Sequence, residues 1–578
     1  MLSEKSSWIR LVPFGGADTV TGSCYCVEET TVEGKVNCYL VDCGLFIGKN
    51  SKKLNTNIAH LANKVDAIFV THGHVDHVGR IPYIYKLGYR GPIYATRPAR
   101  ELAKIRLLDC AKIQDIEYKQ FLKKAGLRNK NIISQIGMEP FYTTEDVINV
   151  MDQFKDVERG QTIKVSDSLE VCFYNAGHEL GSSSIMLTFS HGEETYRLYF
   201  SGDVGQDNVL LKKRVDSFKE NVDLVVMEST YANRFHREKD ESWKELRETA
   251  ANALKKGGNV VFPTFAVGRT QEILYLFYKD MVENDDWIAD IFRHTPVFVD
   301  SCMAVQAMEK FRKFSKEFKA SAYALMADEN NNPFYFPNLT LVAEAEDSKK
   351  VTAMSNNYVV FSAAGMCNAG RVLFHLEKDL PNPNSAVIFT GYQAEGSLGR
   401  YIIDGGKQAK IHGETYDVRA KIASINAFSA HVDQDGLLKW LGKIQKGYKL
   451  FLGHGEPEPQ ETLKEKLIES EMLAEDDIEL MAYGKSYSLY KGGFDVTSFS
   501  VDSQLSAVSE HRSQNNKKKI SEVERIHECI MSIMEDVFEP AALRLLNALE
   551  REINAELVKC RRKKKRQSKP NRSRCGRK

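Results

Sequence analysis

The sequence lacks several features that would place a protein in a membrane or outside the cell. No apolar run approaches the roughly 18 residues that a membrane-spanning helix needs. The first ten residues, MLSEKSSWIR, contain no apolar core of the kind found in signal peptides. The 11 cysteines are scattered and form no CxxC pair, which argues against a zinc-finger or disulfide framework and predicts reduced thiols. These absences together predict a cytoplasmic protein.

Histidine is also scarce, with 14 copies in 578 residues, yet three of them fall in one short stretch, THGHVDHVGR. The preceding residues, VDAIFV, are typical of a short buried strand, and side chains that follow parallel strands often converge on a site. A His-rich polar loop is the alternative, but imidazole and carboxylate are ligands suited to Zn²⁺ and similar ions. The stretch therefore predicts a metal site, with two ligands turned to one side and two to the other, so that the cluster is divided between two ions. Its ligand candidates are His72, His74, Asp76 and His77.

Three further residues occur in comparable contexts, beside glycine and next to an apolar run. Asp42 precedes Gly44, His178 lies in NAGHELGSSS, and Asp203 lies in FSGDVG. Each alone means little, because loop histidines and aspartates usually serve only as hydrogen-bonding groups. Their order along the chain is informative, and Asp203 is the natural bridge because a carboxylate can bind two ions whereas imidazole normally binds one.

The pattern of apolar residues predicts a large α/β protein with more than one domain. Hydrophobic residues make up 43% and charged residues 27%, which is ordinary for a soluble globular chain. Residues 8–48 alternate apolar and polar, which predicts a β-meander; residues 97–160 look mostly helical, and residues 169–204 return to strands. Charged helical segments then alternate with short apolar runs, which predicts a parallel sheet, before β character resumes at about residue 418.

The C-terminal region differs from the rest of the chain. Residues 503–518 resemble a linker, and residues 519–558 form an amphipathic helical pattern. The last 20 residues contain 12 of the 79 Lys and Arg residues and no acidic residue, so the remainder carries 67 basic against 78 acidic groups, a net charge of −11. We expect this tail, 559–578, to be disordered. It is a solvated tail, a nuclear-import signal or an electrostatic contact for nucleic acid, and composition does not separate these alternatives.

In its motifs the chain resembles the β-CASP nucleases, a family of RNA-processing enzymes within the metallo-β-lactamase superfamily. The metal-ligand motifs match in order, and are followed by MESTYANRFH, FPTFAVGRTQE, VDSCMA, FSAAGMCNAGRVLFHL, GYQAEGSLGR, FSAHVDQ and LGHGEPE. The likeness covers residues 8–500 and is strongest to compact prokaryotic members. It implies an αββα metallo-β-lactamase sandwich, formed by residues 1–207 and 419–502, with a β-CASP α/β domain inserted at 208–418.

The resemblance also implies roles for individual residues. His72, His74 and His178 would bind one Zn²⁺; Asp76, His77 and His454 would bind a second; Asp203 would bridge them, and Asp42 would support the ligands or the nucleophile. Two ions about 3.5–4 Å apart would activate a hydroxide and hold the phosphate, with Mn²⁺ as an alternative metal. His431 would donate a proton to the leaving oxygen, and Glu228 would orient that imidazole.

Other residues are candidates for RNA binding. Arg269, in GRTQE, lies where a loop enters a helix and could hold an anion. In SAAGM, the candidates are Ser362 and Gly365; many relatives have SxSGM, and Ala364 replaces their second serine. His375 could face phosphate or serve packing, and Arg400 is a weaker candidate.

The resemblance implies a zinc-dependent ribonuclease that acts on single-stranded RNA as an exonuclease, an endonuclease or both, in RNA processing or decay. His454 favours RNA over DNA, since DNA-acting members tend to lack histidine there. The alternatives are a thioester or lactone hydrolase on the same metal platform, or an inactive RNA-binding subunit. The phosphate-binding signals argue against the first, and the complete ligand set argues against the second. We expect no membrane association, and a homodimer is a weaker expectation from the family.

Overall fold

The sheets of the protein belong to two mixed α/β parts, a sandwich and an insert. The computed structural model describes residues 8–48, 51–125, 139–206, 210–211, 221–329, 331–355, 357–425, 427–445 and 447–498. The chain divides into two compact units, of which the first, Met1–Ala111 with Tyr142–Val501, contains every sheet. The second unit is Lys112–Phe141 with Asp502–Lys578. The predicted linker, C-terminal helix and basic tail at 503–578 lie outside the described residues.

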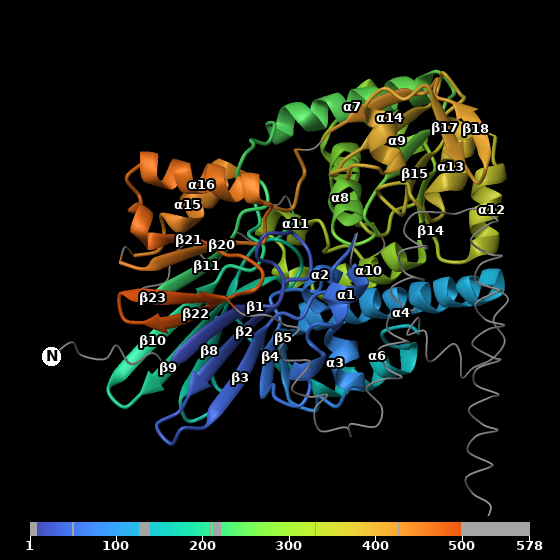
Figure 1. Cartoon of the computed structure of the whole chain (residues 1–578). Helices are drawn as coiled ribbons and strands as arrows, with labels where there is room; N and C mark the ends of the chain where they lie inside the picture. The colour runs from blue at the N-terminus through green and yellow to red at the C-terminus, as the bar shows by residue number, and fades with distance from the viewer. Residues whose placement is uncertain are drawn as a thin grey trace, which may run out of the picture. The chain divides into compact units, whose positions relative to one another are not determined.

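Two sheets lie face to face in the first part (Figure 1). The eight-stranded sheet has the order β23-β22-β1-β2-β3-β4-β5-β6, and the seven-stranded sheet has the order β21-β20-β11-β10-β9-β8-β7. The strands of the first are β1 (Ile9–Pro13), β2 (Tyr25–Thr30), β3 (Val36–Val41), β4 (Ala67–Phe69), β5 (Ile93–Thr96), β6 (Phe154–Val157), β22 (Lys485–Tyr490) and β23 (Gly493–Ser498). Those of the second are β7 (Thr162–Lys164), β8 (Leu169–Asn175), β9 (Ser183–His191), β10 (Glu194–Phe200), β11 (Leu224–Glu228), β20 (Lys449–Gly453) and β21 (Ile478–Leu480).

Alternation of apolar side chains explains why these strands form a layered sandwich. In β9, Ile185, Leu187 and Phe189 point between the sheets, where they meet residues such as Val27 and Phe69 of the other sheet. The intervening side chains face a different core under the helices, where Trp440 stacks on Tyr199 with ring centroids 5.6 Å apart. Because both faces of the seven-stranded sheet are covered, its central strand β11 is buried along its whole length and is apolar up to Glu228.

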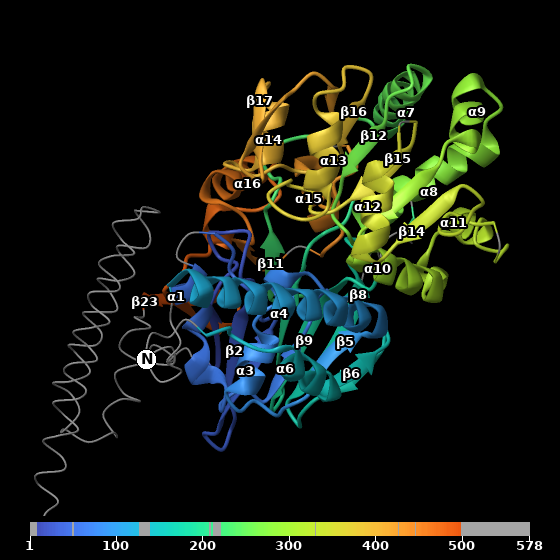
Figure 2. The same ribbon diagram turned by 90° about the vertical axis from the view of Figure 1, so that its right-hand side faces the viewer.

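Helices cover both outer faces of the sandwich, which completes the predicted αββα order. α15 (Gln434–Leu441) and α16 (Pro457–Glu469) lie over the seven-stranded sheet (Figure 1). α3 (Ile81–Lys86) and α6 (Thr144–Val150) pack side by side on the other side, next to the short α1 (Ser51–Thr56) and α2 (Val75–Val78). The view in Figure 2 places α3 and α6 in front of the eight-stranded sheet. α4 (Arg97–Ala125) is long, but no helix in the described ranges is both long and apolar enough to cross a membrane.

The inserted part is built on a six-stranded parallel sheet with the order β14-β13-β15-β12-β16-β19. Its strands are β12 (Val260–Pro263), β13 (Val297–Asp300), β14 (Leu339–Val342), β15 (Val359–Ser362), β16 (Ala386–Phe389) and β19 (Lys421–Ser424), and a hairpin is formed by β17 (Gln408–Ile411) and β18 (Glu414–Asp417). Its helices are α7 (Lys239–Lys255), α8 (Arg269–Glu283), α9 (Trp287–His294), α10 (Cys302–Lys313), α11 (Ala320–Ala324), α12 (Ala345–Ala353), α13 (Val372–Asp379) and α14 (Leu398–Ile403). Single 3₁₀ turns occur at Ala59–Leu61, Met151–Gln153, Ser315–Glu317 and Glu475–Asp477.

The predicted fold class is confirmed, whereas several predicted boundaries shift. β1, β2 and β3 form the antiparallel meander expected at 8–48, but the region 97–160, expected to be mostly helical, ends in β6. β11 pairs with β10 and β20 inside the sandwich, and β19 pairs with β16 inside the insert. The chain thus leaves the sandwich after Glu228 and returns after Ser424, later than the predicted positions 208 and 418. The apolar parallel strands of the sandwich and of the insert look alike in sequence, so the pattern could not assign them.

Arg80, the last residue of the stretch THGHVDHVGR, forms hydrogen bonds to several loops. Its guanidinium is completely buried and donates to Asn57 Oδ1 at 2.9 Å and to the Gly22 carbonyl at 3.0 Å. It also donates to the carbonyls of Phe14, Gly44 and Leu54. Arginine presents five donors in a fixed plane, which lysine cannot reproduce.

We expect Arg80→Lys to lower the free energy of unfolding by about 2–4 kcal/mol, because several buried carbonyls would lose their donor. Urea denaturation followed by tryptophan fluorescence measures this. Arg90→Lys, at an exposed arginine that stacks on Tyr85, is the matched control and should cost less than about 1 kcal/mol. Equal losses in the two variants would contradict a special role for Arg80.

Candidate metal centre

The predicted ligands lie where strands of both sheets end at one edge of the sandwich. Asp42 follows β3, and the loop with His72 follows β4, which runs parallel to β3. In the other sheet β10, β11 and β20 are mutually parallel, and Asp203, Glu228 and His454 occur at or just beyond their C-terminal ends. Parallel strands end at a common edge, so residues far apart in sequence meet there.

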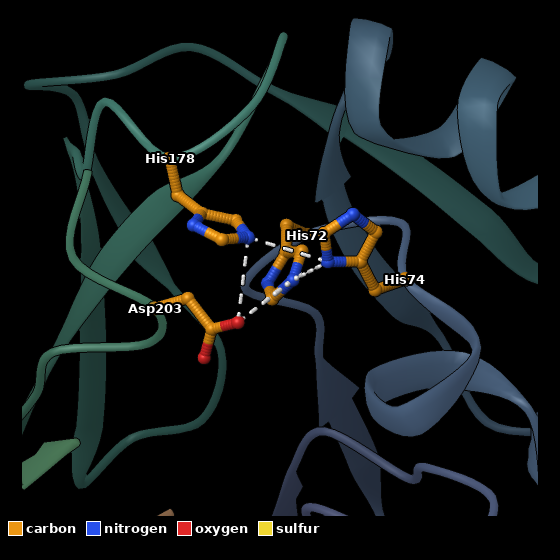
Figure 3. Close-up of side chains that lie close together, drawn as sticks. All are labelled: His72, His74, His178 and Asp203. Atoms are coloured by element: carbon orange, nitrogen blue, oxygen red, sulfur yellow. Dashed lines mark hydrogen bonds and ion pairs between the residues drawn. The ribbon is translucent and has the colours of Figure 1, made fainter. Parts of the chain in front are cut away.

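One group of ligand atoms contains three imidazoles and one carboxylate (Figure 3). His74 Nδ1 lies 2.9 Å from His72 Nε2 and 3.3 Å from His178 Nε2. Asp203 Oδ2 lies 3.4 Å from each of the latter two nitrogens. Four ligands at about 2.0–2.1 Å from a tetrahedral ion are roughly 3.3–3.4 Å from one another, so the spacing fits a single divalent metal.

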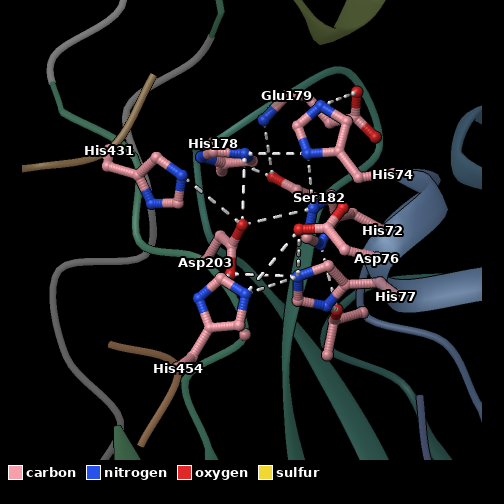
Figure 4. Close-up of polar contacts among 12 residues, drawn as sticks. His72, His74, Asp76, His77, His178, Glu179, Ser182, Asp203, His431 and His454 are labelled. Atoms are coloured by element: carbon pink, nitrogen blue, oxygen red, sulfur yellow. Dashed lines mark hydrogen bonds and ion pairs between the residues drawn. The ribbon is translucent and has the colours of Figure 1, made fainter. Parts of the chain in front are cut away.

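A second group lies on the other side of Asp203 (Figure 4). His77 Nε2 is 3.2 Å from His454 Nε2, and Asp76 Oδ2 is 3.9 Å from both nitrogens. Asp203 Oδ1 is 3.3 Å from His77 Nε2 and 3.3 Å from His454 Nδ1. Asp203 therefore turns one oxygen toward each group, as expected for a bridging carboxylate, and all seven predicted ligands come together.

Burial and neighbouring charges set protonation states that suit cation binding. Burial lowers the pKa of His72 and of His178, and neighbouring imidazoles lower both further, so these rings keep their lone pairs. Burial raises the pKa of Asp203, but His454 and His77 outweigh it, and the net pKa lies well below the usual range. The pKa of Asp76 is lowered in the same way, against its burial, by His454 and His77. The first group therefore offers an ionised carboxylate beside neutral imidazoles. In the second group burial lowers the pKa of His77, but Asp203 and Asp42 outweigh it and raise the pKa well above its usual range.

Asp42 supports the first loop without belonging to either ligand group. Its carboxylate accepts from the Thr71 backbone N–H and the Thr71 hydroxyl, both at 2.8 Å. Its Oδ2 is also 2.7 Å from His77 Nδ1, so a proton on that nitrogen would leave Nε2 free to bind a metal. Asp42 thus contacts both the Thr71 backbone and a ligand ring, and its supporting role stays a prediction.

Glu179 has a similar supporting position that the sequence reading missed. It accepts from the Gly73 backbone at 2.9 Å and from Arg106 at 3.1 and 2.7 Å, and its Oε2 lies 3.4 Å from His74 Nε2. It thus fixes both the ring and the backbone of the His72–His74 loop. The available signal was its position directly after His178 in the sequence.

His431 lies beside the first group but makes its closest polar contact elsewhere. Its Nδ1 is 2.8 Å from Glu228 Oε2, and its Nε2 is 3.7 Å from Asp203 Oδ2. Glu228 is itself fixed, since its other oxygen accepts from the Val204 backbone. Burial lowers the pKa of His431, but Glu228 and Asp203 raise it more, to about 9. The site therefore includes a charged imidazole with a nitrogen that faces the ligand groups.

The predicted RNA-binding residues differ from one another in burial and in their contacts. Arg269 begins α8, is mostly buried and pairs with Glu272 at 2.6 Å; its Nε has no hydrogen-bond partner among the described residues. Gly365 packs closely on the backbone of Thr264 and Phe265.

The remaining three make polar contacts within the insert. His375 has no exposed surface and lies 2.8 Å from Asp300, which favours the packing alternative over an RNA contact. Ser362 is buried and donates to the Asp300 carbonyl at 3.1 Å. Arg400 is on the surface, paired with Asp404 at 2.8 Å.

We expect Glu179→Gln to weaken metal retention about 10- to 100-fold, because His74 and its loop would lose a charged partner. Competition with a chromogenic chelator at equilibrium measures this directly. Glu170→Gln, at an exposed glutamate on β8, is the matched control and should leave retention unchanged. Unaltered retention in Glu179→Gln would contradict the supporting role.

Comparison with known families agrees with the geometry. Residues 31–209 match the metallo-beta-lactamase superfamily domain, residues 270–402 match the Beta-Casp domain, and residues 415–476 match a Zn-dependent metallo-hydrolase RNA specificity domain. The last of these includes His431 and His454.

Individual relatives are similar over most of the chain. Ribonuclease TTHA0252 of Thermus thermophilus is 34% identical over 452 residues, which covers 78% of this chain and 94% of the relative. Transcription termination factor FttA of Methanocaldococcus jannaschii is 30% identical over 463 residues, covering 78% and 67%. FttA of Thermococcus kodakarensis is 28% identical over 471 residues, with the same coverage. The predicted resemblance is thus confirmed: this chain belongs to the β-CASP family of RNA nucleases, which is built on the metallo-β-lactamase fold.

Proposed function

We propose that this protein is a zinc-dependent ribonuclease that hydrolyses phosphodiester bonds in single-stranded RNA. The observation that carries the proposal is Asp203, whose two oxygens face separate groups of ligand atoms while His431 lies 3.7 Å beyond. Support also comes from the relatives, which are named as a ribonuclease and as transcription termination factors, and from the match to an RNA specificity domain.

Seven residues are assigned to two metal ions. His72, His74 and His178 would hold one; Asp76, His77 and His454 would hold the other, and Asp203 would contact both. Imidazole and carboxylate ligands suit Zn²⁺, and Mn²⁺ could substitute. When bound, such ions supply a water-derived nucleophile at neutral pH and stabilise negative charge on the phosphate.

His431 is assigned as the acid that protonates the leaving oxygen. Its Nε2 faces the ligand groups, while its Nδ1 is held 2.8 Å from Glu228, so the ring is oriented and its charged form is favoured. Glu228 acts through His431 and is a positioning residue. Asp42 and Glu179 hold the loop that carries the first ligands.

Other features of the function remain predictions of the sequence. They are the choice between end-trimming and internal cutting, a homodimeric state, a cytoplasmic location and a contribution of the basic tail to RNA affinity. A thioester or lactone hydrolase is the alternative, and it is disfavoured by the match to an RNA specificity domain and by the relative named as a ribonuclease.

We expect His431→Ala to reduce kcat for RNA cleavage about 10²- to 10⁴-fold, because the leaving oxygen would lose its proton donor. Single-stranded RNA labelled at either end, with the matching DNA alongside, serves as the substrate. The products from the two labels distinguish end-trimming from internal cutting.

Bound metal is measured in the same samples and should be unchanged, since His431 is outside both ligand groups. His294→Ala, at an exposed histidine, is the control for the substitution itself. Cleavage at the wild-type rate by His431→Ala would exclude the assigned acid. Absence of cleavage by metal-loaded wild-type protein would count against the proposed activity.

A further inference from the structure

The inserted sheet ends close to the proposed catalytic acid. β15, β12, β16 and β19 are neighbours and run parallel, so their C-terminal ends lie along one edge. The segment that follows β19 leads to His431. In open parallel sheets, ligands are bound by the loops at the carboxyl ends of the strands. The loops that follow the other three strands are therefore placed to contact the same substrate.

Two large aromatic side chains in these loops are half exposed. Phe265, after β12, is 43% exposed, and Tyr392, after β16, is 47% exposed. The two loops touch, because a Cβ atom on Gly391 would lie 3.2 Å from Phe265 Cε2. A Cβ atom on Gly365, in the loop after β15, would lie 3.0 Å from the Phe265 backbone nitrogen. Glycine at both positions allows the loops after β15 and β16 to pack closely against Phe265, the first against its backbone and the second against its ring.

Tyr231 connects these aromatic residues with the proposed acid. Its ring lies edge-on to that of His431, with centroids 5.7 Å apart. Burial raises the pKa of Tyr231; Tyr392 raises it slightly further, and Arg269 opposes this. Tyr392 and Arg269 therefore act electrostatically on a residue whose ring contacts that of His431.

We infer that Phe265 and Tyr392 form a stacking platform for the bases of single-stranded RNA beside the phosphate that is cut. The inference rests on the proposed function and names how that site holds its substrate. Aromatic rings bind any base through its face, so the platform would be sequence-tolerant. An RNA strand is favoured over a peptide because the same edge leads to His431 and carries Arg269, whose Nε has no hydrogen-bond partner among the described residues.

The test compares Phe265→Ala and Tyr392→Ala with wild-type full-length protein loaded with zinc. Each alanine variant should raise KM for a short single-stranded RNA about tenfold, with kcat changed less than threefold, because one stacked base is lost. Tyr392→Phe and Phe265→Tyr keep a ring and should restore KM. Phe374→Ala, at a 50% exposed phenylalanine on α13, is the matched control and should behave as wild type.

Substrates with abasic residues next to the cut site separate stacking from a folding defect. Such RNA should bind wild type about tenfold more weakly, and the alanine variants should show no further loss. Unchanged KM in both variants, or loss of kcat alone, would overturn the platform. If wild type binds RNA without cutting it and the alanine variants bind about tenfold more weakly, the platform is supported while the proposed activity fails. If wild type neither binds nor cuts RNA, both fail.

Discussion

The structure depends on one buried carboxylate that is surrounded by imidazoles. Asp203 lies within 3.3–3.7 Å of a ring nitrogen from each of His72, His77, His178, His431 and His454. A buried carboxylate is stable only beside positive charge. Protons or metal ions held by these five imidazoles provide that charge. Four of the five belong to the two ligand groups, and the fifth is the proposed acid, so the position of Asp203 sets the geometry of metal binding and of proton donation together.

The fold brings these groups together at the C-terminal ends of parallel strands, both in the sandwich and in the insert. Strands of the sandwich end beside the ligands, and strands of the insert end beside His431 and the aromatic residues. Contacts fix the insert on the sandwich, since Lys310 pairs with Glu101 at 3.0 Å and Arg159 with Glu317 at 2.6 Å. Leu102 and Leu180 of the sandwich also pack into the apolar core of the insert. Metal ligands and the proposed substrate contacts can therefore come from different parts of one compact unit.

The sequence predicted the fold class and the meeting of the ligands because glycine-flanked histidines and aspartates after apolar strands form a specific pattern. It could not predict which sheet each apolar strand joins, as β11 and β19 demonstrate, since pairing partners are chosen by tertiary packing. His375 and Arg400 occur in motifs that suggest ligand contact. His375 instead pairs with Asp300, which is distant in sequence, and Arg400 pairs with Asp404, four residues further along the chain. Glu179 and Tyr392 were missed because a lone glutamate or tyrosine carries no pattern until its surroundings are known.

X-ray diffraction from crystals of the zinc-loaded protein, measured on both sides of the zinc absorption edge, tests the central claim most directly. The account predicts two anomalous peaks about 3.5–4 Å apart, with Asp203 between them. One peak should be bound by His72, His74 and His178, and the other by Asp76, His77 and His454. A single peak, or two peaks that do not share Asp203, would contradict the account.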